Sequence, residues 1–143
     1  MAVGRFVADK SAFEQQRHSA AADGLLRALA ADGALYMTEI VALELLYSAR
    51  NAADYEQRRA GLTVFDWLHV STAVAQRALD IQRALAATSL HRRPIRDVLL
   101  TAVALEHEAT ILHYDSDFDL LADATGVSTR WIIPRGTGHG AVP

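Results

Sequence analysis

Short apolar runs alternate along the chain with longer stretches whose apolar residues recur every three to four positions. The short runs have the length of buried strands, and the longer stretches have the period of helices that cover a sheet. We expect strands at residues 4–9, 34–37, 109–114 and 127–133. Helices are expected at residues 11–31, 39–50, 72–87, 94–108 and from 120 onward. Strands that alternate with helices form a parallel sheet covered by helices, which predicts an α/β fold.

Several residues indicate where these helices begin and divide. Ser11 and Glu14 have the spacing of a capping box, and either Ser71 or Thr72 is placed to cap the helix that follows it. Gly24 is the position at which we expect the long stretch to divide into two helices. The polar stretch after Arg50 is typical of a solvated helix or loop, and the apolar stretch that follows it has no clear period and is not assigned.

Carboxylates follow the strand at 109–114 at every second position. Asp115 comes directly after this strand, and Asp117 and Asp119 come next. Open α/β sheets bind their ligands at the carboxyl ends of the strands. Two like charges about 4 Å apart repel by roughly 4 kcal/mol at an effective dielectric of about 20, unless a cation lies between them. The sequence therefore predicts a cation site here, provided that more carboxylates reach the same edge.

Three further acids lie at strand ends or in helices. Asp9 ends the first strand, and Asp97 falls in the first turn of the helix that follows Pro94. Right-handed crossovers place strand ends and the following helix starts on one edge, where both acids can converge with Asp115. Asp9 or Asp97 alone could as well serve only to interact with the dipole of the following helix. Glu44, inside a helix, could as well lie only at the solvent-exposed rim of an apolar face. Oxygen ligands without nitrogen or sulfur select Mg²⁺ or Mn²⁺, and such clusters mostly act on phosphates.

The composition is that of one folded domain without cysteine. Of the 143 residues, 51% are hydrophobic and 22% are charged. We expect one domain over residues 1–134 and a flexible, glycine-rich tail over 135–143. The lack of cysteine favours a reducing cytoplasm and excludes disulfides and thiolate metal sites. No apolar run has the length of a membrane span, and the N-terminus lacks the apolar region of a signal peptide.

The net charge of −3 argues against a protein that coats nucleic acid generally, because such proteins are usually basic. Lys10 is the single lysine, so nearly all of the positive charge is arginine. Arginine is suited to bidentate contact with phosphate, although a GC-rich genome would produce the same bias. The basic residues before Asp97 suit a phosphate-bearing ligand or a solvated loop.

Four motifs, in this order, resemble those of the PIN domain, and most closely those of VapC-type toxins from bacterial toxin–antitoxin pairs. They are V-A-D-K-S-A at 7–12, E-L-L-Y-S-A-R at 44–50, P-I-R-D-V-L at 94–99 and D-S-D-F at 115–118. Each motif is weak alone, whereas the ordered set covers nearly the whole chain. The resemblance implies a PIN-like α/β domain whose central parallel β-sheet has about four to five short strands flanked by α-helices.

The resemblance also implies a Mg²⁺-dependent endoribonuclease, with Mn²⁺ as a substitute, that cuts structured RNA such as tRNA or rRNA and leaves 5′-phosphate and 3′-hydroxyl ends. The catalytic acids would be Asp9, Glu44, Asp97 and Asp115. The metal ligands would be Asp9, Asp97, Asp115 and Asp117, with Ser11 orienting the first carboxylate or a metal-bound water. For contact with RNA phosphates we expect Lys10, Arg92, Arg93 and Arg96. A VapB-type antitoxin that covers the site, and a toxin homodimer, are the implied partners.

One position departs from the family pattern, and three other interpretations stay open. His113 stands where Thr or Ser often lies, two residues before the fourth acid, which leaves the geometry at Asp115 unsettled. A housekeeping PIN nuclease in RNA maturation or decay is the first alternative. A phosphoacceptor receiver domain is the second, but it needs a lysine near the C-terminus and the chain has only Lys10. An inactive PIN-fold binding module is the third, and the intact acid set argues against it.

Overall fold

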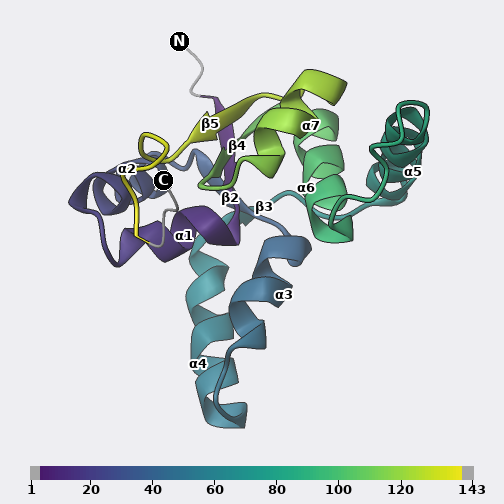
Figure 1. Cartoon of the computed structure of the whole chain (residues 1–143). Helices are drawn as coiled ribbons and strands as arrows, with labels where there is room; N and C mark the ends of the chain where they lie inside the picture. The colour runs from purple at the N-terminus through teal and green to yellow at the C-terminus, as the bar shows by residue number, and fades with distance from the viewer. Residues whose placement is uncertain (1–3, 140–143) are drawn as a thin grey trace.

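A five-stranded parallel sheet forms the centre of the computed structural model, which describes residues 4–139 (Figure 1). Its strands are β1 (Arg5–Ala8), β2 (Leu35–Met37), β3 (Asp66–Trp67), β4 (Ala109–His113) and β5 (Thr129–Trp131). Their order across the sheet is β3-β2-β1-β4-β5, and every neighbouring pair is parallel. The predicted PIN-like α/β fold with a central parallel sheet is confirmed.

Seven α-helices and one 3₁₀ helix connect these strands within residues 4–139. They are α1 (Lys10–Gln16), α2 (Ala20–Ala31), α3 (Glu39–Tyr47), α4 (Ala52–Gly61), η1 (Leu62–Val64), α5 (Thr72–Ala86), α6 (Ile95–Glu106) and α7 (Asp117–Thr125). In this part of the chain, no helix combines the length and the apolar character that crossing a membrane requires.

The two central strands bury side chains on both faces of the sheet. Val7 of β1 and Ile111 of β4 are fully buried in one hydrophobic cluster, together with residues of α3, α5, α6 and α7. Their chain neighbours Ala8 and Leu112 belong to a second cluster, together with residues of α1 and α2. Because both strands are packed from both sides, the core fixes the position of their carboxyl ends.

The helix boundaries confirm some of the predicted caps and correct others. The prediction that the long stretch divides at Gly24 was wrong: α1 ends at Gln16, and Gly24 lies inside α2. The physical reason is Ser19, whose Oγ accepts a hydrogen bond from the backbone N–H of Ala22 at 3.1 Å and caps α2. Ser71 caps α5 as predicted.

The start of α1 also differs from the prediction. The N-cap of this helix is Asp9 and not Ser11, because the Asp9 side chain accepts a hydrogen bond from the backbone N–H of Ser11. The Ser11 hydroxyl, in place of capping the helix, donates to the Asp9 carboxylate and accepts a hydrogen bond from the backbone N–H of Tyr114.

The polar and unassigned stretches of the sequence form an arm and an edge strand. The polar stretch is α4, which has no buried residue and projects away from the sheet beside α3 (Figure 1). The unassigned stretch contains η1 and β3, and β3 pairs with β2 at one edge of the sheet. A two-residue strand has too little length for a periodic signal, which is why the sequence pattern missed it.

The first part of the predicted tail is held against α1. The Tyr114 hydroxyl accepts hydrogen bonds from the backbone N–H groups of Gly136 at 2.9 Å and Gly138 at 2.7 Å. The Gln15 side chain donates to the backbone carbonyl of His139 at 2.9 Å and accepts from its N–H at 2.8 Å. These hydrogen bonds are the contacts of the predicted tail up to His139, and the remainder of the predicted tail lies outside the described residues.

We expect Ser19→Ala to lower the free energy of unfolding by about 1 kcal/mol, because α2 loses its side-chain cap. Urea denaturation measures this change. Ser116→Ala is the matched control, since Ser116 occupies the N-cap position of α7 without a side-chain hydrogen bond, and a change within about 0.5 kcal/mol is expected. Equal losses for the two variants would contradict the role of Ser19 as a cap.

Candidate metal centre

The sheet brings the ends of β1 and β4 side by side. Ala8 pairs with Leu112, and the backbone N–H of Asp9 donates to the carbonyl of Leu112 at 2.9 Å. Asp9, which follows β1, and Asp115, which comes soon after β4, therefore lie at the same edge of the sheet. Asp97 lies in the first turn of α6, as predicted from its place after the proline.

Three of the predicted acids converge at this edge. Asp97, Asp115 and Asp117 each offer a carboxylate oxygen, and these three oxygens lie within 4.8 Å of one another. The backbone N–H of Asp117 donates to Asp115 Oδ1 at 3.0 Å, which orients that carboxylate. Asp97 is only 2% exposed, and its Oδ2 has no hydrogen-bond partner among residues 4–139.

The environment of Asp97 disfavours its negative charge. Burial raises the pKa of Asp97 to about 7, and the nearby charges of Asp9, Asp115 and Asp117 act in the same direction. Arg96 opposes this effect, since its Nε lies 3.6 Å from Asp97 Oδ1. A buried carboxylate with an unpartnered oxygen and a raised pKa is a group that a bound cation would stabilise.

Asp9 lies beside this cluster and is held by Ser11. Asp9 Oδ2 accepts hydrogen bonds from the Ser11 backbone N–H at 3.0 Å and from the Ser11 hydroxyl at 2.6 Å. The same hydroxyl accepts a hydrogen bond from the backbone N–H of Tyr114 at 2.9 Å. Ser11 thus joins the end of β1 to the end of β4, and this geometry supports its predicted role in orienting the first carboxylate.

Glu44 reaches the site from α3. Arg96 Nη1 lies 3.1 Å from Glu44 Oε2, so that Arg96 bridges Glu44 and Asp97. Burial raises the pKa of Glu44, and the charge of Asp9 raises it further. Glu44 Oε1 has no hydrogen-bond partner in the described part of the chain. Neither Asp9 nor Glu44 belongs to the group of three converging oxygens, although both lie close enough to affect a neighbouring acid electrostatically.

The four predicted phosphate-contacting residues have different surroundings. Arg93 Nη1 lies 3.8 Å from Asp117 Oδ1, so that Arg93, like Arg96, pairs with an acid of the cluster. Lys10 pairs with Glu14 at 3.7 Å, and Arg92 is exposed. The cluster is therefore partly neutralised by two arginines.

The donor set fits a hard divalent cation. All of the converging ligand atoms are carboxylate oxygens, which Mg²⁺ and Mn²⁺ prefer. The unpartnered oxygens of Asp97 and Glu44 add two acceptors whose hydrogen-bonding capacity is unused. The residues present at this edge are thus suited to hold such an ion.

Comparisons with known proteins identify the family of this chain. A family model for the PIN domain matches residues 10–124. The chain is 45% identical over 109 residues to Ribonuclease VapC51 of Mycobacterium tuberculosis, which covers 76% of this chain and 80% of that relative. The chain belongs to the VapC family of PIN-domain proteins. Ribonuclease VapC18 of the same organism is 38% identical over 135 residues, covering 92% of this chain and 98% of the relative.

Solved structures of VapBC complexes share the fold. A DNA-bound VapBC from Salmonella typhimurium superposes with a TM-score of 0.72 at 15% identity, covering 92% of this VapC-family chain and 100% of that chain. VapBC2 from Rickettsia felis, bound to a DNA fragment from its promoter, gives a TM-score of 0.70 at 16% identity, covering 87% and 96%. At these identities the likeness concerns the fold.

His113, the departure from the VapC pattern, fixes the backbone at the fourth acid. Its ring is fully buried, and Nδ1 accepts a hydrogen bond from the backbone N–H of Asp115 at 3.1 Å. Phe118 and Trp131 pack against the ring, with centroids 5.1 Å and 4.9 Å away. Burial lowers the pKa of His113, which favours the neutral ring that can accept this bond.

Sequence reasoning missed two features of the site. Arg96 was expected to contact RNA phosphate, and its bridge between Glu44 and Asp97 was not predicted, because Glu44 lies 52 positions away. The one local signal is that Arg96 directly precedes Asp97. The hydrogen bond from Asp115 to His113 was also missed, since it depends on the turn after β4.

In EDTA, we expect Asp97→Asn to raise the melting temperature relative to the native protein by an amount that grows as the pH rises. Folding raises the pKa of Asp97 from 3.8 to about 7. The native protein therefore loses stability as the pH rises between these values, whereas the amide does not ionise. At roughly 1.4 kcal/mol per pKa unit the upper limit is about 4 kcal/mol, and loss of the Arg96 pair offsets part of it.

Thermal melts between about pH 4 and pH 8 measure this difference. Asp123→Asn, at an exposed position of α7, is the control and should leave the pH dependence of the native protein unchanged. If the difference in melting temperature between Asp97→Asn and the native protein is constant over this pH range, the raised pKa of Asp97 in the folded protein is contradicted.

Proposed function

We propose that this protein is a metal-dependent endoribonuclease toxin that hydrolyses phosphodiester bonds in structured RNA such as tRNA or rRNA. The observation that carries the proposal is the convergence of Asp97, Asp115 and Asp117, with an unpartnered oxygen on the buried Asp97. The relatives named ribonucleases support the nuclease activity. The proposed ion is Mg²⁺, with Mn²⁺ as a substitute, because every donor is an oxygen atom.

The proposed metal ligands are Asp9, Asp97, Asp115 and Asp117. When bound, the ion supplies a water of lowered pKa and a positive centre for the phosphate oxygens. Ser11 would hold the Asp9 carboxylate in position through its two hydrogen bonds. Asp97 would be held in its charged form, because the cation compensates for burial and for the neighbouring acids.

Glu44 is proposed to take the proton of the attacking water. Its free Oε1 offers a position for the proton, and the pKa of Glu44, which burial raises, makes the carboxylate a stronger base than an exposed glutamate. The water oxygen forms a bond to phosphorus, and the bond from phosphorus to the 3′ oxygen breaks. The products carry a 5′-phosphate and a 3′-hydroxyl, and the leaving oxygen is protonated from solvent.

Arg93 and Arg96 are proposed to exchange their partners during this process. Both pair with acids at this edge of the sheet. A cation on those acids would weaken the pairs and allow the guanidinium groups to contact RNA phosphates. Lys10 and the exposed Arg92 are proposed to contact the RNA backbone nearby.

The proposed partner is a VapB-type antitoxin that covers the site with its C-terminal segment. The structural neighbours support this pairing, because they are solved as VapBC complexes. We also propose a toxin homodimer and a cytoplasmic location, where the RNA substrate and the antitoxin are synthesised.

Purified protein freed of antitoxin should cut total cellular RNA into discrete fragments with Mg²⁺ or Mn²⁺ and should not cut it with EDTA. We expect Asp9→Asn and Asp97→Asn to reduce cleavage at least 100-fold while remaining folded, since each removes a carboxylate ligand. Asparagine is chosen at position 9 because it preserves the N-cap of α1.

The control for this experiment is Asp32→Asn, at the exposed C-terminal end of α2, which should cleave like the native protein. Mapping of the fragment ends would identify the RNA and the cut position. Absence of cleavage with either metal, from folded protein free of antitoxin, would refute the nuclease and favour a PIN-fold binding module.

A further inference from the structure

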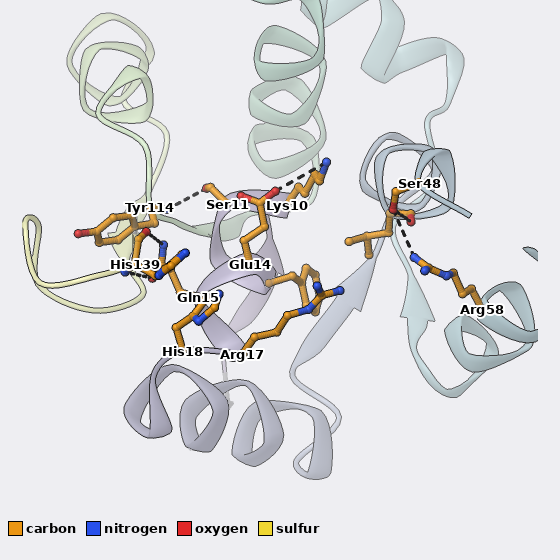
Figure 2. Close-up of a pocket in the computed structure, with 12 residues that line it drawn as sticks. Lys10, Ser11, Glu14, Gln15, Arg17, His18, Ser48, Arg58, Tyr114 and His139 are labelled. Atoms are coloured by element: carbon orange, nitrogen blue, oxygen red, sulfur yellow. Dashed lines mark hydrogen bonds and ion pairs between the residues drawn. The ribbon is translucent and has the colours of Figure 1, made fainter. Parts of the chain in front are cut away.

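A cavity of about 580 Å³ lies beside the acid cluster, between α1, the end of α3, α4 and the chain segment at 135–139 (Figure 2). Lys10, Leu45 and Tyr114 line it, and each is the chain neighbour of a proposed catalytic acid. The cavity therefore lies next to the site at which a phosphodiester bond would be cut, although none of the acids of that site lines it. Its volume falls within the range of roughly 300–1,000 Å³ that is typical of small-molecule sites.

The cavity is cationic, although the whole chain is acidic. Its lining carries the positive charges of Lys10, Arg17 and Arg58 against the single negative charge of Glu14. Arg17, at the C-cap of α1, and Arg58, from α4, point into the cavity from opposite sides (Figure 2). Arg58 pairs with Asp54 at 3.2 Å, and Lys10 pairs with Glu14. Within residues 4–139, the Arg17 side chain makes no ion pair or hydrogen bond that would hold it elsewhere. A guanidinium group without an acidic partner is available for a phosphate.

The wall of the cavity opposite α4 is tightly packed. Gln15, only 5% exposed, uses its whole amide on the backbone of His139. Gly138 lies so near that a Cβ atom there would come within 2.6 Å of Gln15 Oε1 and of Tyr114 Cζ. His18 and His139 stack at the cavity, with ring centroids 3.7 Å apart and an interplanar angle of 19°. This segment therefore places a flat aromatic pair at a fixed position beside the cations.

We propose that this cavity binds the nucleotide of the RNA strand that adjoins the scissile phosphate. Arg17 and Arg58 contact its phosphate, and the imidazole pair of His18 and His139 provides a stacking surface for its base. The inference rests on the proposed function, because it takes the acid cluster as the place of cleavage. RNA is favoured over an acidic peptide of the antitoxin because a base uses the aromatic pair and because the strand must continue from the cleavage site.

Equilibrium binding of a fluorescein-labelled, 12-nucleotide single-stranded RNA tests this proposal. The measurement uses the full chain with Asp97→Asn and Mg²⁺, so that the probe is not cut. Adding Arg17→Ala should weaken binding about 5- to 10-fold at 0.1 M salt. It should also reduce the slope of log K against log salt by about 0.7, the value for one phosphate contact on a single strand. Arg17→Lys should recover part of the affinity.

The matched control is Arg83→Ala, which removes the same charge from an exposed position on α5, a helix that contributes no residue to the lining of the cavity. It should leave the affinity and the slope unchanged. Equal RNA affinities of the Arg17→Ala and Arg83→Ala proteins would overturn the proposal. If Arg17→Ala weakens the binding of a glutamate-rich peptide but leaves the binding of RNA unchanged, the proposal is overturned as well, and the antitoxin is the favoured occupant of the cavity.

Cleavage of total RNA by the native protein separates this proposal from the proposed function. If the native protein cleaves and Arg17→Ala binds RNA like the control, the nuclease stands and the nucleotide pocket is refuted. If the native protein does not cleave but Arg17→Ala still loses RNA affinity, the pocket stands as an RNA-binding site and the nuclease is refuted.

Discussion

Repulsion among carboxylates at the carboxyl edge of the sheet is the constraint on which this site depends. Asp97, Asp115 and Asp117 approach within 4.8 Å of one another, and at such distances each like-charge pair costs on the order of a few kcal/mol. The free energy that keeps them together comes from elsewhere in the fold. Arg93 and Arg96 offset part of the repulsion, and the buried strands behind the site supply the rest.

The strand order explains why the acids meet at this place. From β1 the chain passes to β2 and β3 on one side, and β4 and β5 lie on the other. The boundary between β1 and β4 is thus the topological switch point, where open α/β sheets leave a crevice at the carboxyl ends of their strands. Asp9 follows β1 and Asp115 follows β4, so that both flank this crevice. The Ser11 hydroxyl is hydrogen-bonded to Asp9 after β1 and to the backbone N–H of Tyr114 after β4, and these bonds fix the width of the crevice.

Local signals in the sequence predicted the parts of the site that lie at strand ends and helix starts. Asp97, Asp115 and Asp117 were placed correctly, because each follows a strand or a proline and its position needs only the α/β topology. The break between the two helices was misplaced at Gly24, since glycine signals helix breaks, but the Ser19 cap sets the start of α2 and the exposed Gly24 costs that helix only about 1 kcal/mol. The contact of Gln15 with His139 spans 124 positions and leaves no local trace, so the cavity wall was beyond sequence reasoning.

The proposed binding of metal and of RNA would be coupled through the same carboxylates. The acids hold Arg93 and Arg96 in ion pairs, and the excess of carboxylates gives the site a negative potential that repels a polyanion. A divalent ion would invert the local charge and compete with the arginines for the same oxygens. The arginines would then be available to phosphate when the ion is bound. In a protein with a net charge of −3, this coupling would add to the attraction of RNA by the cationic cavity and would concentrate it at the edge where the proposed cleavage takes place.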